Sequence, residues 1–325
     1  MIRRTLLSAA LVLSATLYSG AVMAQAQNFP DKPLQLIVPF APGGNADIVA
    51  RVIAQGLSDE LGQPVLVVNK AGANAAIGAE FVARAAPNGL TLLFATAETH
   101  ALNPHLRKSL PYDAVNDFVS IGIVDRFPFS LVVNPTVPSG SLTEFVAHAK
   151  RNDGKLNFAS WGNGSTSQIA FEQIKQVAGI RLEHVPFQGA APAITAVAAG
   201  DVQAFVVPLS VALPHASAGR VKVLAVTSAA RELAAPNIPT ATEQGLPVVI
   251  SGWHILAAPA GTPAPVLARL NAALNAVNAK ADIREKLVRA GVQPASSSLE
   301  EVAQMVRTEY RRWGEVARKA GLEPQ

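Results

Sequence analysis

Apolar residues along the chain follow two patterns, four-residue spacing and short continuous runs. Val49, Ile53 and Leu57 recur every four residues, which predicts a helix over 46–61 with Gly62 as its stop signal. Short apolar runs predict strands at 34–40, 65–68, 91–95, 118–124, 130–133, 156–159, 182–185, 202–207 and 221–226. Helical patterns lie at 77–86, 141–150, 167–178, 191–199, 263–279, 283–290 and 298–313. The βαβ alternation favours an α/β fold with mainly parallel sheets covered by helices.

The strand and helix patterns fall into two runs, which predicts two lobes. Roughly 300 residues follow the N-terminal segment, a length typical of two domains. No Pro/Gly/Ser-rich linker separates the runs, so strand-like segments are expected to cross between the lobes as a hinge. The expected lobe 1 comprises 27–130 and 228–325, and the expected lobe 2 comprises 131–227.

The first 26 residues have the pattern of an export signal. Arg3 and Arg4 precede an almost continuously apolar run over 6–17, and small residues offer cleavage sites after Ala24 or Ala26. The run is shorter than the ~20 residues that span a bilayer, so a membrane anchor is the less favoured alternative. A periplasmic location of the mature chain is therefore expected.

Composition excludes several function classes. The chain has no cysteine, so disulfides, thiolate metal sites and a lipid-modified cysteine are excluded. The net charge of +4 falls to +2 when Arg3 and Arg4 are removed with the signal segment, which has no acidic residue. That charge is too small to indicate nucleic-acid binding. With 50% hydrophobic residues the chain is expected to be a compact globule. We also expect the chain to be a monomer.

Three loops join a strand to a helix through glycine, and each could hold an anion. The first is Pro42-Gly43-Gly44-Asn45-Ala46-Asp47. Its adjacent glycines permit close approach by a ligand, and the helix start offers free N–H groups. The alternative is a tight turn in which Asp47 is placed to suit the helix dipole.

The second loop is Gly162-Asn163-Gly164-Ser165-Thr166-Ser167, and the third runs over 187–192 through Gly189 and Ala190. Three hydroxyls in the second loop could bond an oxyanion, whereas the alternative is a hydroxyl-rich helix cap. The first loop belongs to one expected lobe and the other two to the second, as a cleft between lobes requires.

Motifs for catalysis and metal binding are absent from the sequence. The histidines show no H-E-x-x-H spacing, and no G-x-S-x-G surrounds a serine, so no metal, cofactor or enzymatic activity is expected. The rival hypothesis is a secreted hydrolase with Ser165 or Ser167 as nucleophile. It would need a histidine base that no motif names.

Short motifs along the whole mature chain resemble one receptor family. They are 33–40 running into Pro42-Gly43-Gly44 and Asp47, Gly78-Ala79-Glu80, His100-Ala101-Leu102-Asn103-Pro104, Leu110-Pro111-Tyr112-Asp113, 162–167, His184-Val185-Pro186-Phe187, Ala212-Leu213-Pro214-His215, 224–228 and 258–263. In this order they resemble the Bordetella-uptake-gene type of extracytoplasmic receptor, the binding component of tripartite tricarboxylate transporters.

The resemblance implies a type II periplasmic-binding fold, with a ligand between two α/β lobes and a membrane permease as partner. A ligand carboxylate would be held at Gly43, Gly44, Ala46 and Asp47, and the loop over 164–167 would close on it. Trp161, Val207-Pro208 and His254 depart from what relatives often carry there, so the identity of the ligand does not follow from the resemblance.

The body of the ligand is expected to lie against Trp161, at the end of the strand before the second loop. Phe127 and Phe129 could form a second wall, whereas packing of Trp161 into the interlobe core is the alternative. A rigid aromatic dicarboxylate such as terephthalate could reach both anion loops, and an aliphatic dicarboxylate is the alternative ligand. The predicted ligand-binding residues are Gly43, Gly44, Asn45, Ala46, Asp47, Thr96, Glu98, Phe127, Ser160, Trp161, Gly164, Ser165, Thr166, Ser167, Gly189, Ala190, Val207 and Pro208.

Overall fold

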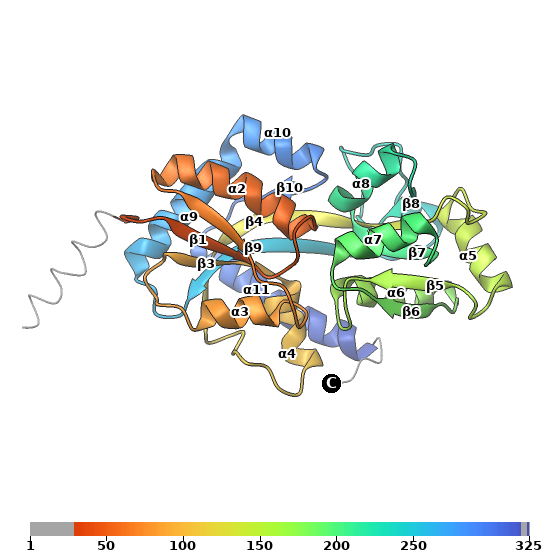
Figure 1. The fold of residues 1–325 in the computed structure, drawn as a ribbon, viewed down its shortest axis with the longest axis horizontal. Coiled ribbons are helices and arrows are strands. Elements are labelled where there is room, and N and C mark those ends of the chain that lie inside the picture. Colours follow the sequence, from red (N-terminus) through yellow and green to blue (C-terminus); the bar gives the residue numbers. More distant parts are fainter. Residues whose placement is uncertain (1–28, 320–323, 325) are drawn as a thin grey trace, which may run out of the picture.

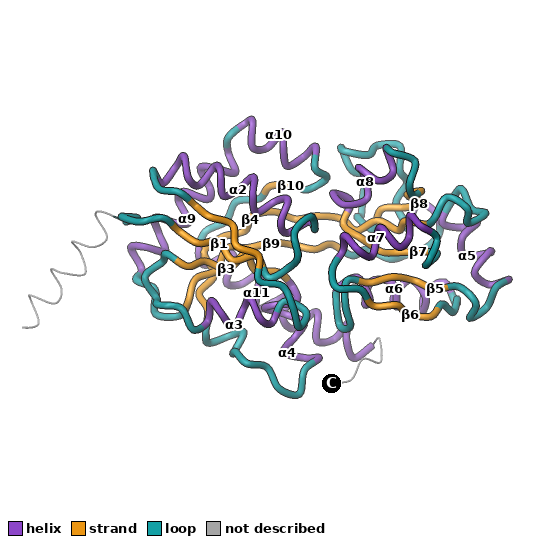
Figure 2. The backbone as a smooth tube through the Cα atoms, viewed as in Figure 1, coloured by secondary structure: helices purple, strands orange, loops and turns teal. Residues whose placement is uncertain are grey.

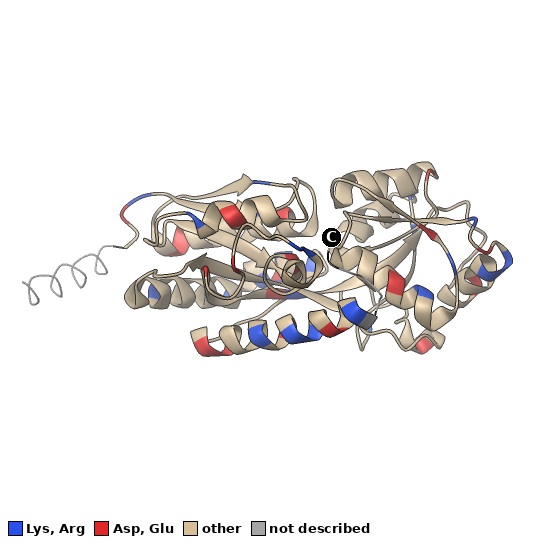
Figure 3. Cartoon of the chain, turned by 90° about the horizontal axis from the view of Figure 1, so that it is seen from below, with Lys and Arg blue, Asp and Glu red and all other residues tan. Residues whose placement is uncertain are grey.

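The computed structural model describes residues 29–319 and 324, so the predicted export signal lies outside the described residues. The molecule is elongated, with two groups of helices and strands joined by the long strands that pass between them (Figure 1). No helix among the described residues is long and apolar enough to cross a membrane. Charged residues of both signs are spread over the helices of both groups (Figure 3).

One group is built on the strands we call sheet A. These are β1 (Leu34–Val38), β2 (Val65–Asn69), β3 (Thr91–Thr96), β9 (Ser251–Pro259), β10 (Gln293–Pro294) and the first part of β4 (Phe118–Val133). Its helical segments are α2 (Asn45–Leu61), α3 (Ala76–Ala83), the π-helical turn η1 (Glu98–Leu102), α4 (Asn103–Leu106), α9 (Ala264–Ala279), α10 (Ala281–Arg289) and α11 (Leu299–Lys319).

The other group is built on sheet B. Its strands are β5 (Asn157–Ser160), β6 (Glu183–Pro186), β7 (Ala204–Pro208), β8 (Lys222–Val226) and the end of β4. Its helices are α5 (Leu142–Arg151), α6 (Thr166–Ala178), α7 (Ala190–Ala199) and α8 (Leu209–Ser217) (Figure 2). The short 3₁₀ turn η2 (Thr242–Gln244) follows β8 in the chain.

The prediction of mainly parallel sheets is correct for the pairings among β1, β2 and β3 and among β5, β6 and β7. β1 pairs in parallel with β2 and β3, and β5 pairs in parallel with β6 and β7. The strands nearest the middle are antiparallel. β9 lies between β3 and β4 and is antiparallel to both, and β4 is also antiparallel to β7 and β8. The long strand β4 runs from sheet A into sheet B, so the two groups are joined without a separate linker.

A single strand, β4, stands where the sequence predicts two. Two strands are predicted at 118–124 and 130–133, with a break where Asp125, Arg126 and Pro128 interrupt the apolar run. The structure has one strand of 16 residues, because the carboxylate of Asp125 is paired with His254 on β9 and needs no solvent. The strand β9 itself has no counterpart among the predicted strands.

Helix α2 shows how the pattern of the sequence positions the first loop. Val49, Ile53 and Leu57 have no exposed surface, so the four-residue spacing faces the core as predicted. Gly62 adopts a left-handed conformation with φ 69° and its N–H donates to the carbonyl of Ser58, which ends the helix. The core anchors the helix, and its N-terminus points to the space between the two sheets (Figure 1).

β4 leaves β9 after Pro128, and it pairs with β7 from Phe129 and with β8 from Ser130. A hinge at this point would let the two groups rotate relative to each other. The division into domains at 130/131 and 227/228 stays a prediction.

Candidate ligand-binding site

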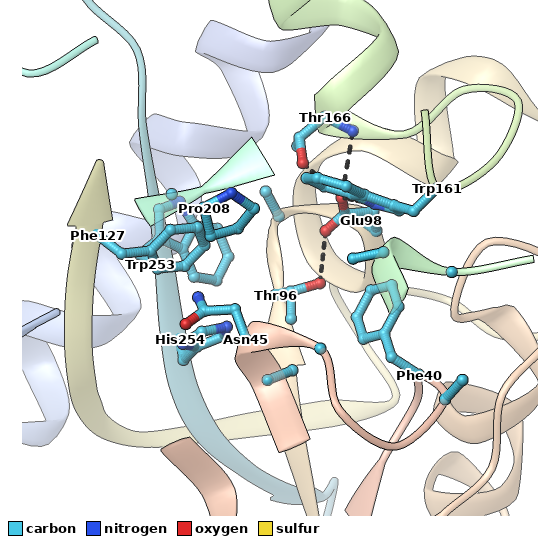
Figure 4. Close-up of a pocket in the computed structure, with 17 residues that line it drawn as sticks. Phe40, Asn45, Thr96, Glu98, Phe127, Trp161, Thr166, Pro208, Trp253 and His254 are labelled. Atoms are coloured by element: carbon cyan, nitrogen blue, oxygen red, sulfur yellow. Dashed lines mark hydrogen bonds between the residues drawn. The ribbon is translucent and has the colours of Figure 1, made fainter. Parts of the chain in front are cut away.

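A cavity of about 60 Å³ lies between sheet A and sheet B (Figure 4). A buried water needs roughly 10–15 Å³ of such volume, so the cavity has room for several water-sized groups, and a ring-sized ligand would have to widen it. Of the predicted site residues, those that line it are Gly44, Asn45, Ala46, Thr96, Glu98, Phe127, Trp161, Thr166, Gly189, Ala190 and Pro208. The wall is completed by Phe40, Ala41, Ala97, Gly252, Trp253 and His254, which are not among the predicted ligand-binding residues. The predicted residues outside the wall are Gly43, Asp47, Ser160, Gly164, Ser165, Ser167 and Val207.

Asp47 shapes the first loop rather than facing the cavity. Its carboxylate accepts hydrogen bonds from the backbone N–H of Gly43 at 3.0 Å and from Asn69 Nδ2 at 2.9 Å, and it forms an ion pair with Arg51. Burial alone would raise the pKa of Asp47, but the bonds from Arg51, Gly43 and Asn69 hold that pKa below its ordinary value. The carboxylate therefore stays charged and fixes the turn in which Gly43 has a φ of 83°.

The N-terminus of α2 opens directly on the cavity. Gly44 and Ala46 line it with Asn45, and the first N–H groups of a helix have no partner within the helix. Asn45 is 5% exposed; its Oδ1 accepts a 2.7 Å hydrogen bond from Ser210 Oγ, whereas its Nδ2 is buried with no partner among the described residues. An unpaired buried donor costs free energy, so the arrangement favours a ligand that brings an acceptor.

The N-terminus of α7 reaches the same cavity from sheet B. Gly189, with a φ of 124°, and Ala190 line the wall opposite the first loop. A Cβ placed on Gly189 would lie 3.6 Å from the Cβ of Ala41, so the two loops are almost in contact. Two helix N-termini from opposite sheets therefore converge on one cavity, and both favour a negative charge there.

The predicted hydroxyl-rich loop at α6 does not present its serines to the cavity. Ser165 caps α6 by accepting from the N–H of Gln168, and Ser167 Oγ donates to the carbonyl of Val206 at 2.6 Å. Both serines are fully buried. Of the three hydroxyls in this loop, only that of Thr166 belongs to a residue of the cavity wall.

The hydroxyl of Ser160 also has its hydrogen-bond partners within the protein. Its Oγ lies 2.6 Å from His184 Nε2 and 3.0 Å from the carbonyl oxygen of Gly162. Burial, assisted by the charge of Lys175, lowers the pKa of His184 to about 4. Because Ser160 has no exposed surface, the Ser160–His184 pair cannot reach a substrate and instead holds the loop before α6.

Glu98 fills the place at α6 that was predicted for a ligand. It extends from η1 on the sheet A side, and its Oε1 accepts from the N–H of Thr166 at 3.2 Å and from Thr166 Oγ1 at 2.6 Å. Trp161 Nε1 donates to the same oxygen at 3.3 Å, and Thr96 Oγ1 donates to Oε2 at 2.8 Å. Trp161, Glu98 and Thr166 lie at one end of the cavity in Figure 4, and Asn45 and His254 lie at the other.

A buried histidine–aspartate pair lies beside the Asn45 end. His254 Nδ1 is 2.9 Å from one carboxylate oxygen of Asp125 and 3.0 Å from the other, and the two residues are neighbours in the β4–β9 ladder. Phe127 stacks on the imidazole with ring centroids 4.7 Å apart. The carboxylate orients the ring with Nδ1 toward Asp125, so the opposite edge of the ring is the one available to the cavity.

Aromatic rings form the apolar part of the wall. Trp161 lies near Phe129, with ring centroids 6.0 Å apart, and makes an edge contact with Phe205. It therefore both packs on the interior and lines the cavity, which combines the two alternatives raised by the sequence. Phe129 and Val207 are fully buried behind the wall.

The described residues include no group of three or more potential ligands that could hold a metal ion. None of the described residues that line the cavity is Lys or Arg. An anion would therefore be bound by helix N-termini and neutral donors rather than by an opposing charge.

Comparisons with known proteins decide the family. The model of the tripartite tricarboxylate transporter family receptor matches residues 49–322. The chain belongs to this receptor family. BugT of Bordetella pertussis is 33% identical to the receptor over 305 residues, which cover 93% of this chain and 94% of that protein. The members of the family are substrate-binding receptors and not enzymes, as the sequence predicted.

Solved structures of similar proteins agree with the fold. The structure of R. palustris Rpa4515 with adipate matches the receptor with a TM-score of 0.89 at 31% identity, covering 91% of this chain and 100% of that one. MatC (Rpa3494) from Rhodopseudomonas palustris with bound malate matches with a TM-score of 0.83 at 33% identity, covering 89% and 99%. The receptor therefore has the type II periplasmic-binding fold that its sequence predicts.

Proposed function

We propose that this chain captures a small carboxylate in the periplasm and delivers it to the membrane permease of a tripartite tricarboxylate-type transporter. The observation that carries the proposal is the α2 end of the cavity, where a buried, unpaired Asn45 Nδ2 lies beside the N-terminus of a 17-residue helix. A carboxylate supplies the acceptors and the negative charge that both features favour. Similar receptors hold adipate and malate, which supports the same chemical class here.

Capture takes place by closure of the two lobes about the crossing strands. The wall combines loops from the sheet A side with loops from the sheet B side, so a ligand that contacts both stabilises the closed arrangement. The permease would recognise the closed form of a monomeric receptor. Export with cleavage near Ala24 or Ala26 would place the receptor in the periplasm.

The walls favour a ligand with a flat apolar body. Trp161, Phe127 and Phe40 offer ring surface on different sides of the cavity. An aromatic carboxylate, with terephthalate as the example predicted from the sequence, uses this surface better than an aliphatic chain. It also loses less rotamer freedom on binding.

Calorimetric titration tests the proposal, with terephthalate, benzoate, hexanoate and adipate as probes. We expect saturable one-to-one binding of at least one of the four, with a change in tryptophan fluorescence because Trp161 lines the cavity. A ligand at 100 times its Kd should also stabilise the folded protein by ~2.7 kcal/mol in a thermal-shift assay. Failure of all four to bind would contradict the proposed function.

A further inference from the structure

Glu98 lies in the cavity at the N-terminus of α6, where it occupies donors that could otherwise bind an anion. It is 3% exposed and is the only acidic residue among the described residues that line the wall. Its Oε1 accepts three hydrogen bonds, from Trp161 Nε1 and from the N–H and the hydroxyl of Thr166. These donors are the ones that an anion at the N-terminus of α6 would use.

The donors at α6 are therefore already satisfied from within the chain. A carboxylate accepts about four hydrogen bonds in all, and Glu98 receives its fourth from Thr96 Oγ1. A ligand carboxylate that displaced Glu98 would leave that buried side chain without its partners, which is costly. Displacement is thus unfavourable even before the charges are considered.

Electrostatic repulsion from Glu98 also disfavours a second ligand carboxylate at this end of the cavity. A second carboxylate placed beside Glu98 would meet a like charge at short range in a buried site, where the interaction is only weakly screened. The wall offers no Lys or Arg among its described residues to offset that repulsion, and His254 is already paired with Asp125. A second negative charge at the far end of the ligand is therefore unfavourable.

We propose that Glu98 is a built-in anion for the α6 N-terminus and makes the receptor selective for monocarboxylates over dicarboxylates of the same body. This inference rests on the proposed function, because it concerns the same cavity, and it replaces terephthalate by a monocarboxylate such as benzoate as the expected aromatic ligand. The ligand then has one carboxylate at the α2 end and an apolar or aromatic body that extends toward Trp161 and Glu98.

Two matched ligand pairs test the inference: benzoate with terephthalate, and hexanoate with adipate. Calorimetry of the wild type should give a Kd for each monocarboxylate that is about tenfold or more below that of its dicarboxylate, equivalent to roughly 1.4 kcal/mol. In Glu98→Ala the α6 donors are vacant, so the ratio should shift toward the dicarboxylate by about tenfold or more. Glu98→Gln keeps the size of the side chain and removes its charge, so it should reduce the preference while retaining benzoate binding.

Controls keep the outcomes distinct. Glu80→Ala removes a carboxylate on α3 that pairs with Arg84 at the surface, and it should leave both ratios unchanged. Thermal unfolding reports whether Glu98→Ala folds, and Glu98→Gln carries the test if it does not. A wild type that prefers the dicarboxylates, or ratios unmoved in both Glu98 variants, would overturn this inference alone. A wild type that binds none of the four ligands would overturn the proposed function with it.

Discussion

The N-termini of α2 and α6 have similar local sequences, but they differ in whether their hydrogen-bond donors are already occupied. Each follows a parallel strand and a glycine-containing loop, and each belongs to a long helix whose first N–H groups face the space between the sheets. At α2 the buried Nδ2 of Asn45 has no partner among the described residues. At α6 the donors of Thr166 and Trp161 are occupied by Glu98.

The difference shows that a helix N-terminus marks a place for an anion but does not say which anion fills it. The local signal at α6, with its three hydroxyls, is the stronger of the two. It is nevertheless satisfied inside the protein, by Glu98 from 68 residues earlier in the chain and by the carbonyl of Val206. The weaker signal at α2 is the one left open for a ligand.

The substitution expected to change binding most is Asn45→Asp. A carboxylate there would repel the bound carboxylate across a few ångströms, so calorimetry should show affinity for benzoate falling by about a hundredfold or more, roughly 2.7 kcal/mol. Folding should be preserved, because Asp can still accept from Ser210 and suits the first turn of a helix. Asn163→Asp adds the same charge at an exposed loop and should leave affinity nearly unchanged. Equal affinity in Asn45→Asp and the wild type would show that the ligand carboxylate does not bind at α2.

Removing the indole of Trp161 tests the other end of the cavity. We expect Trp161→Ala to weaken benzoate binding by about 1–3 kcal/mol, because the ligand loses ring contact and Glu98 loses a donor. Trp161→Phe keeps a ring and should recover most of the affinity. Titration of both variants separates the two roles, and an affinity indifferent to the alanine would assign Trp161 to packing alone.

The serines at α6 should affect stability rather than binding. Ser167→Ala leaves the carbonyl of Val206 without its 2.6 Å hydrogen bond, so the free energy of unfolding should fall by about 1–2 kcal/mol. The Kd for benzoate should change less than about twofold, since the hydroxyl does not line the cavity. Denaturant unfolding and calorimetry on the same preparation make the comparison. A large loss of affinity with unchanged stability would show that Ser167 takes part in ligand binding.

The smallest effect concerns pH on the sheet B side. The pKa of His184 is lowered to about 4 by burial and by Lys175, so the folded state holds this ring neutral. The unfolded state binds a proton near pH 6.5, and stability is therefore complete above that value and falls as pH drops toward 4. After allowance for the partly exposed ring, the loss at pH 5 should be about 1 kcal/mol or less. Thermal unfolding at pH 7 and 5 should show a smaller fall for His184→Gln, and an equal fall would assign the loss to other groups.

Much of the fold could be predicted from the sequence because it depends on local patterns. The four-residue spacing of Val49, Ile53 and Leu57 identifies the buried face of α2, and short apolar runs identify the outer parallel strands. The middle of the molecule could not be predicted in the same way. Asp125 and His254 each interrupt an apolar run, and only their pairing across β4 and β9 makes both compatible with buried strands.

The candidate site was predictable to a similar degree. Glycine before a helix start located the loops that carry Gly44, Thr166 and Gly189, all of which line the cavity. The partners of Ser167 and Thr166 lie far away in the sequence, so nothing local indicated that they are occupied. Phe40 was missed because it lies at the end of a strand whose other side chains serve the core, and His254 was named only as a departure from relatives, without a role in binding.

A crystal structure of the wild type grown with benzoate distinguishes the α2 end from the α6 end as the place of the carboxylate. The carboxylate oxygens should lie within hydrogen-bond distance of Asn45 Nδ2 and of the first N–H groups of α2. Glu98 should remain bonded to Thr166, and the ring should be directed toward Trp161. A benzoate carboxylate bound to Thr166, with Glu98 displaced from α6, would contradict this placement.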